Sequence, residues 1–97
     1  MRIVARKTIV NFYQNHSDLK IALEEWYSKT QRAEWLNSSE IKQTFNSVYS
    51  VGNDRFVFNI KGNDYRLVAL ILFKIKTVYV RFIGTHAEYD KTDCTKI

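Results

Sequence analysis

The stretch that decides the fold covers residues 55–73 and reads RFVFNIKGNDYRLVALILF. In its first part, the apolar residues Phe56, Phe58 and Ile60 occupy every second position. This period of two is typical of a β-strand. Gly62 and Asn63 then offer the positive-φ residues of a tight hairpin. The remainder, Tyr65 to Phe73, is predicted to be the second strand of that hairpin. The stretch therefore predicts two antiparallel strands joined by a two-residue loop.

The segments on the C-terminal side extend this hairpin into a three-stranded meander. Residues 67–73 are apolar on both faces, which predicts a central strand covered on each side. Thr77 to Thr85 alternates again and is expected to be the last strand. Its two faces are predicted to carry Val78, Val80 and Phe82 on one side and Tyr79, Arg81 and Ile83 on the other.

The chain before the meander predicts a short opening strand, Met1 to Val4, and a helical hairpin. Two segments carry apolar or aromatic residues at helical spacing, on Ile9, Phe12, Tyr13 and His16 and then on Leu19, Ala22, Leu23 and Trp26. We expect Ser17 to cap the second helix, Glu40 to Phe45 to form a short helix, and Asn46 to Asp54 to be irregular. Trp26 and Trp35 are expected in the core. The result is an α+β fold in one domain, residues 1–97.

Composition excludes several classes of protein. With 45% hydrophobic and 26% charged residues and no proline, the chain has the make-up of a globular protein. No apolar run is long enough for a signal peptide or a membrane span, and the lone Cys94 cannot form an internal disulfide. Two histidines and one cysteine give no zinc spacing, and there is no glycine-rich phosphate loop. We expect a soluble cytoplasmic protein without metal or cofactor.

The net charge of +5 is concentrated in the C-terminal half of the chain. Residues 1–54 hold seven Lys/Arg against six Asp/Glu, whereas residues 55–97 hold eight against four. Such a surplus attracts polyanions, so nucleic acid is a natural partner, although an acidic protein is drawn equally well.

Strand register predicts a polar cluster on one face of the meander. With Gly62 and Asn63 as the loop, Asn59 faces Arg66. If the second connection is also even-numbered, Arg66 faces Thr85 and Leu70 faces Arg81. Burying an unpaired guanidinium on the apolar face is costly, which favours this even register. The predicted shared face carries Asn59, Arg66, Arg81 and Thr85.

The sheet is expected to pass directly into a short helix. Thr85 to Glu88 has the S/T-x-x-E form of a capping box, so His86 begins a helix that also contains Tyr89 and Asp90. His86 should then lie close to Arg66, whereas Arg81 lies about 13 Å along the sheet from the Arg66 row.

Two segments around this cluster resemble HigB-type toxins of the RelE/ParE superfamily, residues 57–67 (VFNIKGNDYRL) and 81–90 (RFIGTHAEYD). The resemblance extends through residues 22–27 and 33–35 to the opening residues 2–4. It implies a compact sheet backed by an N-terminal helical hairpin, cleavage of mRNA in the decoding site of the ribosome, and neutralisation by a helix-turn-helix antitoxin of the HigA type. The motif positions carry over as Asn59, Asn63, Arg66, His86 and Tyr89.

RNA can be cut without metal when its 2′-hydroxyl attacks the adjacent phosphorus, which requires a base, an acid and positive charge. Arg66 suits the phosphate, or else forms a salt bridge to Asp64 or Asp90. His86 suits the base or the acid, and equally a bond to Asp90 that fixes the helix. Tyr89 suits proton donation, stacking on a base, or packing with a satisfied hydroxyl.

The other candidates are predicted to bind RNA rather than to take part in chemistry. Asn59 is expected to orient Arg66 or to contact RNA. Lys61 and Asn63 lie at the turn, where a solvated lysine and turn geometry explain them equally well, and Arg81 extends the basic face. Two other functions remain open: a non-nucleolytic toxin of the ParE type, since that branch shares the fold, and a plain RNA-binding module.

Overall fold

The structure, a computed structural model, describes residues 1–4, 6–62 and 64–97. The elements follow one another as β1 (Arg2–Val4), α1 (Arg6–Asn15), the 3₁₀ turn η1 (Ser17–Leu19), α2 (Lys20–Arg32), α3 (Ser38–Thr44), β2 (Val48–Gly52), β3 (Arg55–Ile60), β4 (Tyr65–Leu72), the 3₁₀ turn η2 (Phe73–Ile75), β5 (Thr77–Thr85) and α4 (His86–Asp90). None of the helices in the described ranges combines the length and apolarity needed to span a bilayer.

The strands form one five-stranded sheet in the order β1-β5-β4-β3-β2. Every pairing is antiparallel except that of β1 with β5. The predicted α+β class, opening strand, helical hairpin and C-terminal helix are therefore confirmed. The central position of β4 is confirmed as well, because Leu67, Val68, Ala69 and Ile71 are all fully buried.

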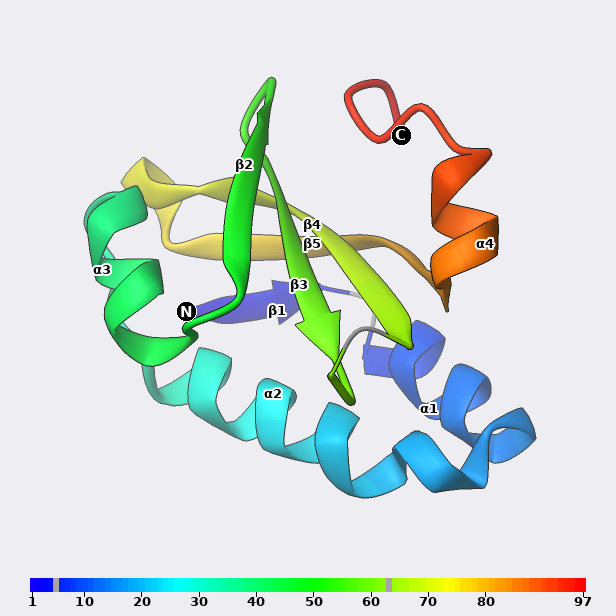
Figure 1. Ribbon diagram of the computed structural model, residues 1–97. Coiled ribbons are helices and arrows are strands. Elements are labelled where there is room, and N and C mark those ends of the chain that lie inside the picture. The colour runs from blue at the N-terminus through cyan, green and yellow to red at the C-terminus, as the bar shows by residue number, and fades with distance from the viewer. Residues whose placement is uncertain (5, 63) are drawn as a thin grey trace.

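The two faces of the sheet are covered by different parts of the chain. Helices α1 and α2 run along one face, whereas α4 and the C-terminal residues lie on the other side (Figure 1). The larger core joins the helices to one face through Leu23, Trp26, Phe58 and Leu67 among others. A smaller cluster on the opposite face contains Val57, Val68 and Cys94, with Phe82, Tyr89 and Ile97 packed against it.

Aromatic side chains anchor the helical hairpin to the sheet, as predicted for the tryptophans. Trp26 and Trp35 are each only 2% exposed. The Trp26 ring stands edge-on to Phe58 at 5.4 Å between centroids, a geometry that rings favour. Trp35 donates from Nε1 to Oγ1 of Thr44 at 3.0 Å, so its polar edge is satisfied.

Two local expectations for the first half are wrong. Ser17 does not cap α2, because residues 17–19 form η1 and α2 begins after Leu19 without a side-chain cap. Residues 48–52, expected to be irregular, form β2 at the edge of the sheet. An edge strand needs apolar residues on one side only, and the positive φ values of Gly52, Asn53 and Asp54 form the turn that leads into β3.

The first hairpin has the predicted register, with Asn59 opposite Arg66 and Ile60 opposite Tyr65. Its loop differs in detail, because Lys61 takes a positive φ of 52° together with Gly62 at 67°. Asn63, the other expected turn residue, lies outside the described residues.

The second hairpin has a different register from the one predicted. Leu70 pairs with Tyr79 rather than Arg81, and Arg66 pairs with Gly84 rather than Thr85. The ladder passes from Ala69–Val80 to Val68–Phe82, so Arg81 is the extra residue of a β-bulge. Because of this extra residue, the side chains of β5 after Arg81 point to the opposite faces of the sheet from those expected in a regular strand. Phe82 therefore packs in the smaller cluster and Ile83 against the larger core, the opposite of their predicted faces.

Candidate functional site

Arg66 lies on the central strand β4 with only 7% of its surface exposed. Its Nη1 donates to the backbone oxygen of Tyr65 at 3.3 Å, and its guanidinium carbon stands 5.8 Å from the ring centroid of Tyr89. A cation within about 6 Å of an aromatic ring is attracted by the ring's electrons. The guanidinium is thereby held where β4 and β5 meet α4.

The start of α4 is fixed by the predicted capping box. The Thr85 hydroxyl accepts from the backbone of Glu88 at 3.2 Å, and the Glu88 carboxylate accepts from the backbone of Thr85 at 2.8 Å. The backbone of His86 also donates to the carbonyl of Asp64 at 3.1 Å, which ties the helix to the β3–β4 turn. These bonds set the direction in which α4 presents Tyr89 to Arg66.

Tyr89 is half-buried and hydrogen-bonded to a residue that the sequence analysis missed. Tyr49, on β2, donates its hydroxyl to the hydroxyl of Tyr89 at 3.0 Å. Burial raises the pKa of Tyr89 above its ordinary value. Tyr89 is therefore a neutral phenol at physiological pH, able to donate a proton but not to accept one as a phenolate.

Tyr49 was missed because its segment was expected to be irregular. A signal was nevertheless present: Val48 to Val51 is rich in strand-forming residues, and Gly52, Asn53 and Asp54 follow it immediately before β3. Read as a regular hairpin, these residues would have indicated a strand with Tyr49 opposite Phe58, whereas an irregularity between Ser50 and Gly52 places Tyr49 opposite Val57.

His86 begins α4, three residues before Tyr89. Its Nδ1 lies 3.0 Å from Oδ2 of Asp90, with 51% of the His86 side chain exposed. The predicted bond between these two residues is therefore confirmed. Asp90 fixes the ring orientation and leaves Nε2 as the other nitrogen available for proton transfer.

The remaining predicted residues are not all brought to this cluster. Asn59 pairs with Arg66 on the β3–β4 ladder, and its side-chain oxygen is buried without a hydrogen-bond partner among the described residues. Lys61 forms an ion pair with Asp18 at 2.8 Å, so the turn lysine is joined to η1 rather than simply solvated. Arg81 is exposed in the bulge. Asn63 lies outside the described residues.

Gly84 lies opposite Arg66 on the ladder, at a position where its neighbours leave no room for a side chain. A Cβ at this position would stand 2.6 Å from Cζ of Phe82 and 3.1 Å from Oε1 of Glu88. Contacts this close force the neighbours to move, and overpacking of this kind costs about 1–3 kcal/mol.

We expect Gly84→Ala to lower the free energy of unfolding by about 1–3 kcal/mol, measured by urea denaturation. The Phe82 ring provides the clash, so in a Phe82→Leu background the same change should cost less. An equal cost in both backgrounds would contradict this explanation.

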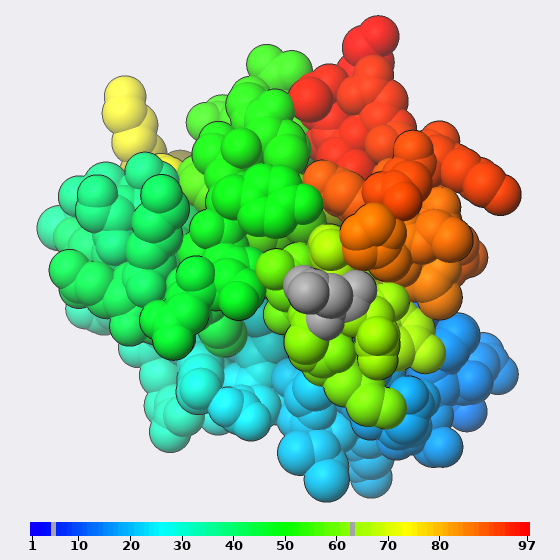
Figure 2. Space-filling model, in the orientation of Figure 1, coloured from blue at the N-terminus to red at the C-terminus, as the bar shows by residue number. Residues whose placement is uncertain are grey.

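The surface above this cluster is shared by segments that are distant in the sequence. Figure 2 shows the green surface of β2 and the orange surface of α4 on the same side of the molecule, with the yellow-green end of the β3–β4 hairpin between them. Arg66, Tyr89 and Tyr49 are thus joined by contacts across β4, α4 and β2. A guanidinium beside a phenol, with a histidine three residues before that phenol on the same helix, supplies groups suited to binding a phosphodiester and moving protons on it.

Comparison with known proteins identifies the class. The model of the HigB toxin family, described as the RelE-like toxic component of a toxin-antitoxin system, matches residues 19–92. The chain belongs to this family.

Curated relatives cover nearly the whole chain. The mRNA interferase toxin HigB of Escherichia coli strain K12 is 25% identical over 92 residues, which cover 93% of this chain and 88% of the relative. The mRNA interferase HigB of Shigella flexneri gives the same values. A third, from Escherichia coli O6:H1, is 26% identical over 93 residues, with 94% and 90% covered.

Proposed function

We propose that this protein is an endoribonuclease that cuts mRNA on the translating ribosome in the cytoplasm, and that a helix-turn-helix antitoxin of the HigA type inhibits it. Membership of a toxin family and the names of the relatives support this function. The observation that carries it is the Arg66 guanidinium, held under the Tyr89 ring beside the helix that begins with His86. A fork of N–H donors is the side chain best matched to a phosphate.

The proposed reaction is an internal transfer. The 2′-oxygen forms a bond to the adjacent phosphorus while the bond from phosphorus to the 5′-oxygen breaks, giving a 2′,3′-cyclic phosphate and a 5′-hydroxyl. One base takes the proton of the 2′-hydroxyl and one acid gives a proton to the 5′-oxygen. Arg66 stabilises the charge on the phosphorane, and Asn59 orients it.

The proton carriers in this proposal are His86 and Tyr89. The raised pKa of Tyr89 restricts its phenol to donation. His86, oriented by Asp90, then takes the proton of the 2′-hydroxyl.

The test is primer extension on a purified message incubated with the protein, with and without ribosomes engaged on it. We expect new 5′ ends inside the coding region only when ribosomes translate the message. The control is Arg66→Gln under the same conditions, which should leave the message intact. Equally efficient cleavage without ribosomes would contradict the proposed ribosome dependence. A message left intact by the native protein would contradict the proposed ribonuclease activity.

A further inference from the structure

The site contains one aromatic ring that faces solvent. Of the phenylalanine, tyrosine and tryptophan residues in the described ranges, Tyr49 alone is exposed, with 39% of its surface accessible. The Tyr89 ring is less accessible to a ligand, because it packs against the cluster of Val57, Val68 and Cys94. The guanidinium carbon of Arg66 also lies 5.8 Å from the centroid of this ring. The ring surface that a ligand can reach at this site is therefore that of Tyr49.

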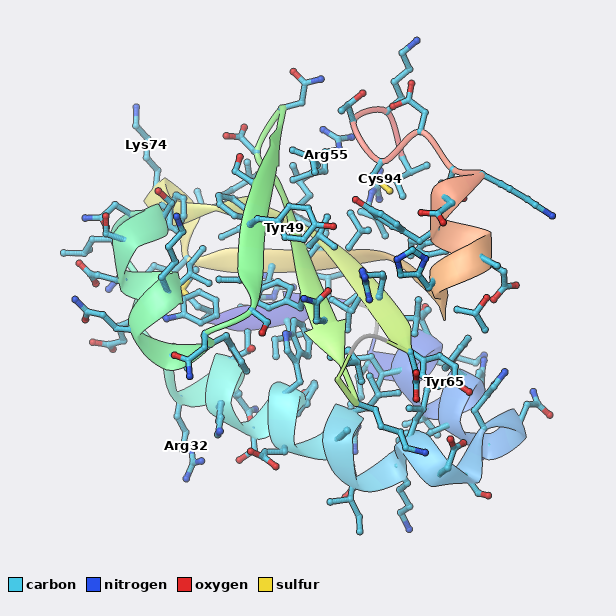
Figure 3. The ribbon with its side chains drawn as sticks, in the orientation of Figure 1. Arg32, Tyr49, Arg55, Tyr65, Lys74 and Cys94 are labelled. Carbon is cyan, nitrogen blue, oxygen red and sulfur yellow. The ribbon has the colours of Figure 1, made fainter. Side chains whose placement is uncertain are left out.

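The Tyr49 ring is also held in place. It projects from β2 across the sheet toward α4 (Figure 3). Its hydroxyl is joined to Tyr89 at 3.0 Å, and its backbone pairs with Val57 on β3. A side chain fixed in this way has already lost much of its rotamer freedom, so a ligand that stacks on it loses less entropy on binding.

The placement of this ring relative to Arg66 defines the ligand. The hydroxyls of Tyr49 and Tyr89 lie 3.0 Å apart, and the Tyr89 ring is in contact with the guanidinium. Tyr89 thus lies between the Tyr49 ring and the Arg66 guanidinium. An aromatic ring at this separation from a phosphate-binding arginine can receive an unpaired nucleotide, with its base on the ring and its phosphate on the cation.

We infer that the Tyr49 ring is the platform on which a nucleobase adjacent to the scissile phosphate stacks, so that the site takes single-stranded RNA with that base unstacked from its neighbours. This inference rests on the proposed ribonuclease function. Stacking on an aromatic ring is possible for every base, so the platform supplies affinity and position rather than a strict sequence preference.

A second role for Tyr49, confined to its hydroxyl, makes different predictions. If Tyr49 acts only by donating to Tyr89, then Tyr49→Phe and Tyr49→Leu are equally damaging. If the ring is the platform, Tyr49→Phe retains function and Tyr49→Leu does not. Tyr79→Leu, a half-buried tyrosine on β5 opposite Leu70, is the matched control.

The experiment measures binding of a fluorescent 2′-O-methyl adenosine hexamer, which lacks the attacking hydroxyl, and of the same hexamer with abasic residues. We expect Tyr49→Leu to weaken binding of the adenosine hexamer by about fivefold or more and to leave the abasic hexamer unaffected. Tyr49→Phe and Tyr79→Leu should stay within about twofold of the native protein, since neither loses the Tyr49 ring.

Salt dependence separates the ring from the cation. Tyr49→Leu should leave the slope of log Kd against log salt unchanged, whereas Arg66→Gln should reduce it by about 0.7 for one lost phosphate contact. Equal loss on the adenosine and abasic hexamers, or equal loss in the Phe and Leu variants, would overturn the platform. So would a native protein that binds neither hexamer. Cleavage of translated message by the native protein would then still support the ribonuclease, which primer extension tests independently.

Discussion

Arg66→Gln is expected to reduce mRNA cleavage by about 10²- to 10³-fold, the usual cost of removing one preorganised donor from a developing oxyanion. Glutamine keeps a hydrogen-bonding amide but is shorter and loses the charge and the fork of donors that match two phosphate oxygens. The measurement is single-turnover cleavage of a ribosome-bound message at saturating toxin, so that a change in binding does not enter the rate.

Two comparisons make this result specific to the site. Arg66→Lys keeps the charge without the bidentate geometry and should recover only part of the rate. Arg32→Gln removes an arginine that points away from the sheet on the opposite side of the molecule (Figure 3), and should cleave as the native protein does. Since Arg66 is buried, thermal unfolding of each variant is measured alongside. Native rates in a folded Arg66→Gln variant would remove Arg66 from the chemistry.

His86→Ala is expected to lower the same single-turnover rate by about 10²- to 10⁴-fold, the range for loss of a general acid or base. The His86 side chain is half-exposed and its bond to Asp90 lies on the surface, so we expect thermal stability to change little.

Asp90→Asn is the matched variant for this prediction. It removes the carboxylate that orients the imidazole while leaving the imidazole in place. A catalytic His86 predicts a smaller loss for Asp90→Asn than for His86→Ala. Equal, mild losses from both changes, accompanied by equal losses in thermal stability, would indicate that the pair serves only to hold α4.

The parts of the fold that follow from local patterns could be predicted from the sequence. The alternation in residues 55–60 and the apolar run that follows gave β3, β4 and their register, and the Thr85–Glu88 capping box gave the start of α4. The burial of Trp26 followed from its helical spacing. Each of these features is decided by residues within a few positions of one another.

The site was predicted only in part because its geometry depends on a bulge. The predicted register of β5 holds only for a regular ladder, whereas Arg81 is an extra residue between the paired residues Val80 and Phe82. The extra residue shifts the pairing beyond it. Gly84 rather than Thr85 lies opposite Arg66, and Tyr79 rather than Arg81 lies opposite Leu70. A bulge that keeps a charged side chain exposed is a tertiary solution with no short-range signal in these residues.

Tyr49 shows the same limit at longer range. Its role depends on contact with a residue forty positions further along the chain, through a bond between two hydroxyls. Spacing within β2 could indicate a strand, but only the packing of α4 on β4 and β5 brings Tyr89 within reach of that strand. A site formed by the ends of several elements is therefore harder to predict from the sequence than the helices and strands that form it.

The most direct measurement of the central claim is the mass of the two RNA fragments formed when the native protein cuts a ribosome-bound message of known sequence. An upstream fragment ending in a 2′,3′-cyclic phosphate and a downstream fragment beginning with a 5′-hydroxyl are the products that attack by the 2′-oxygen, guided by Arg66, must leave. A downstream fragment that begins with a 5′-phosphate, or cleavage that persists with a 2′-deoxyribose at the cut position, would contradict the account.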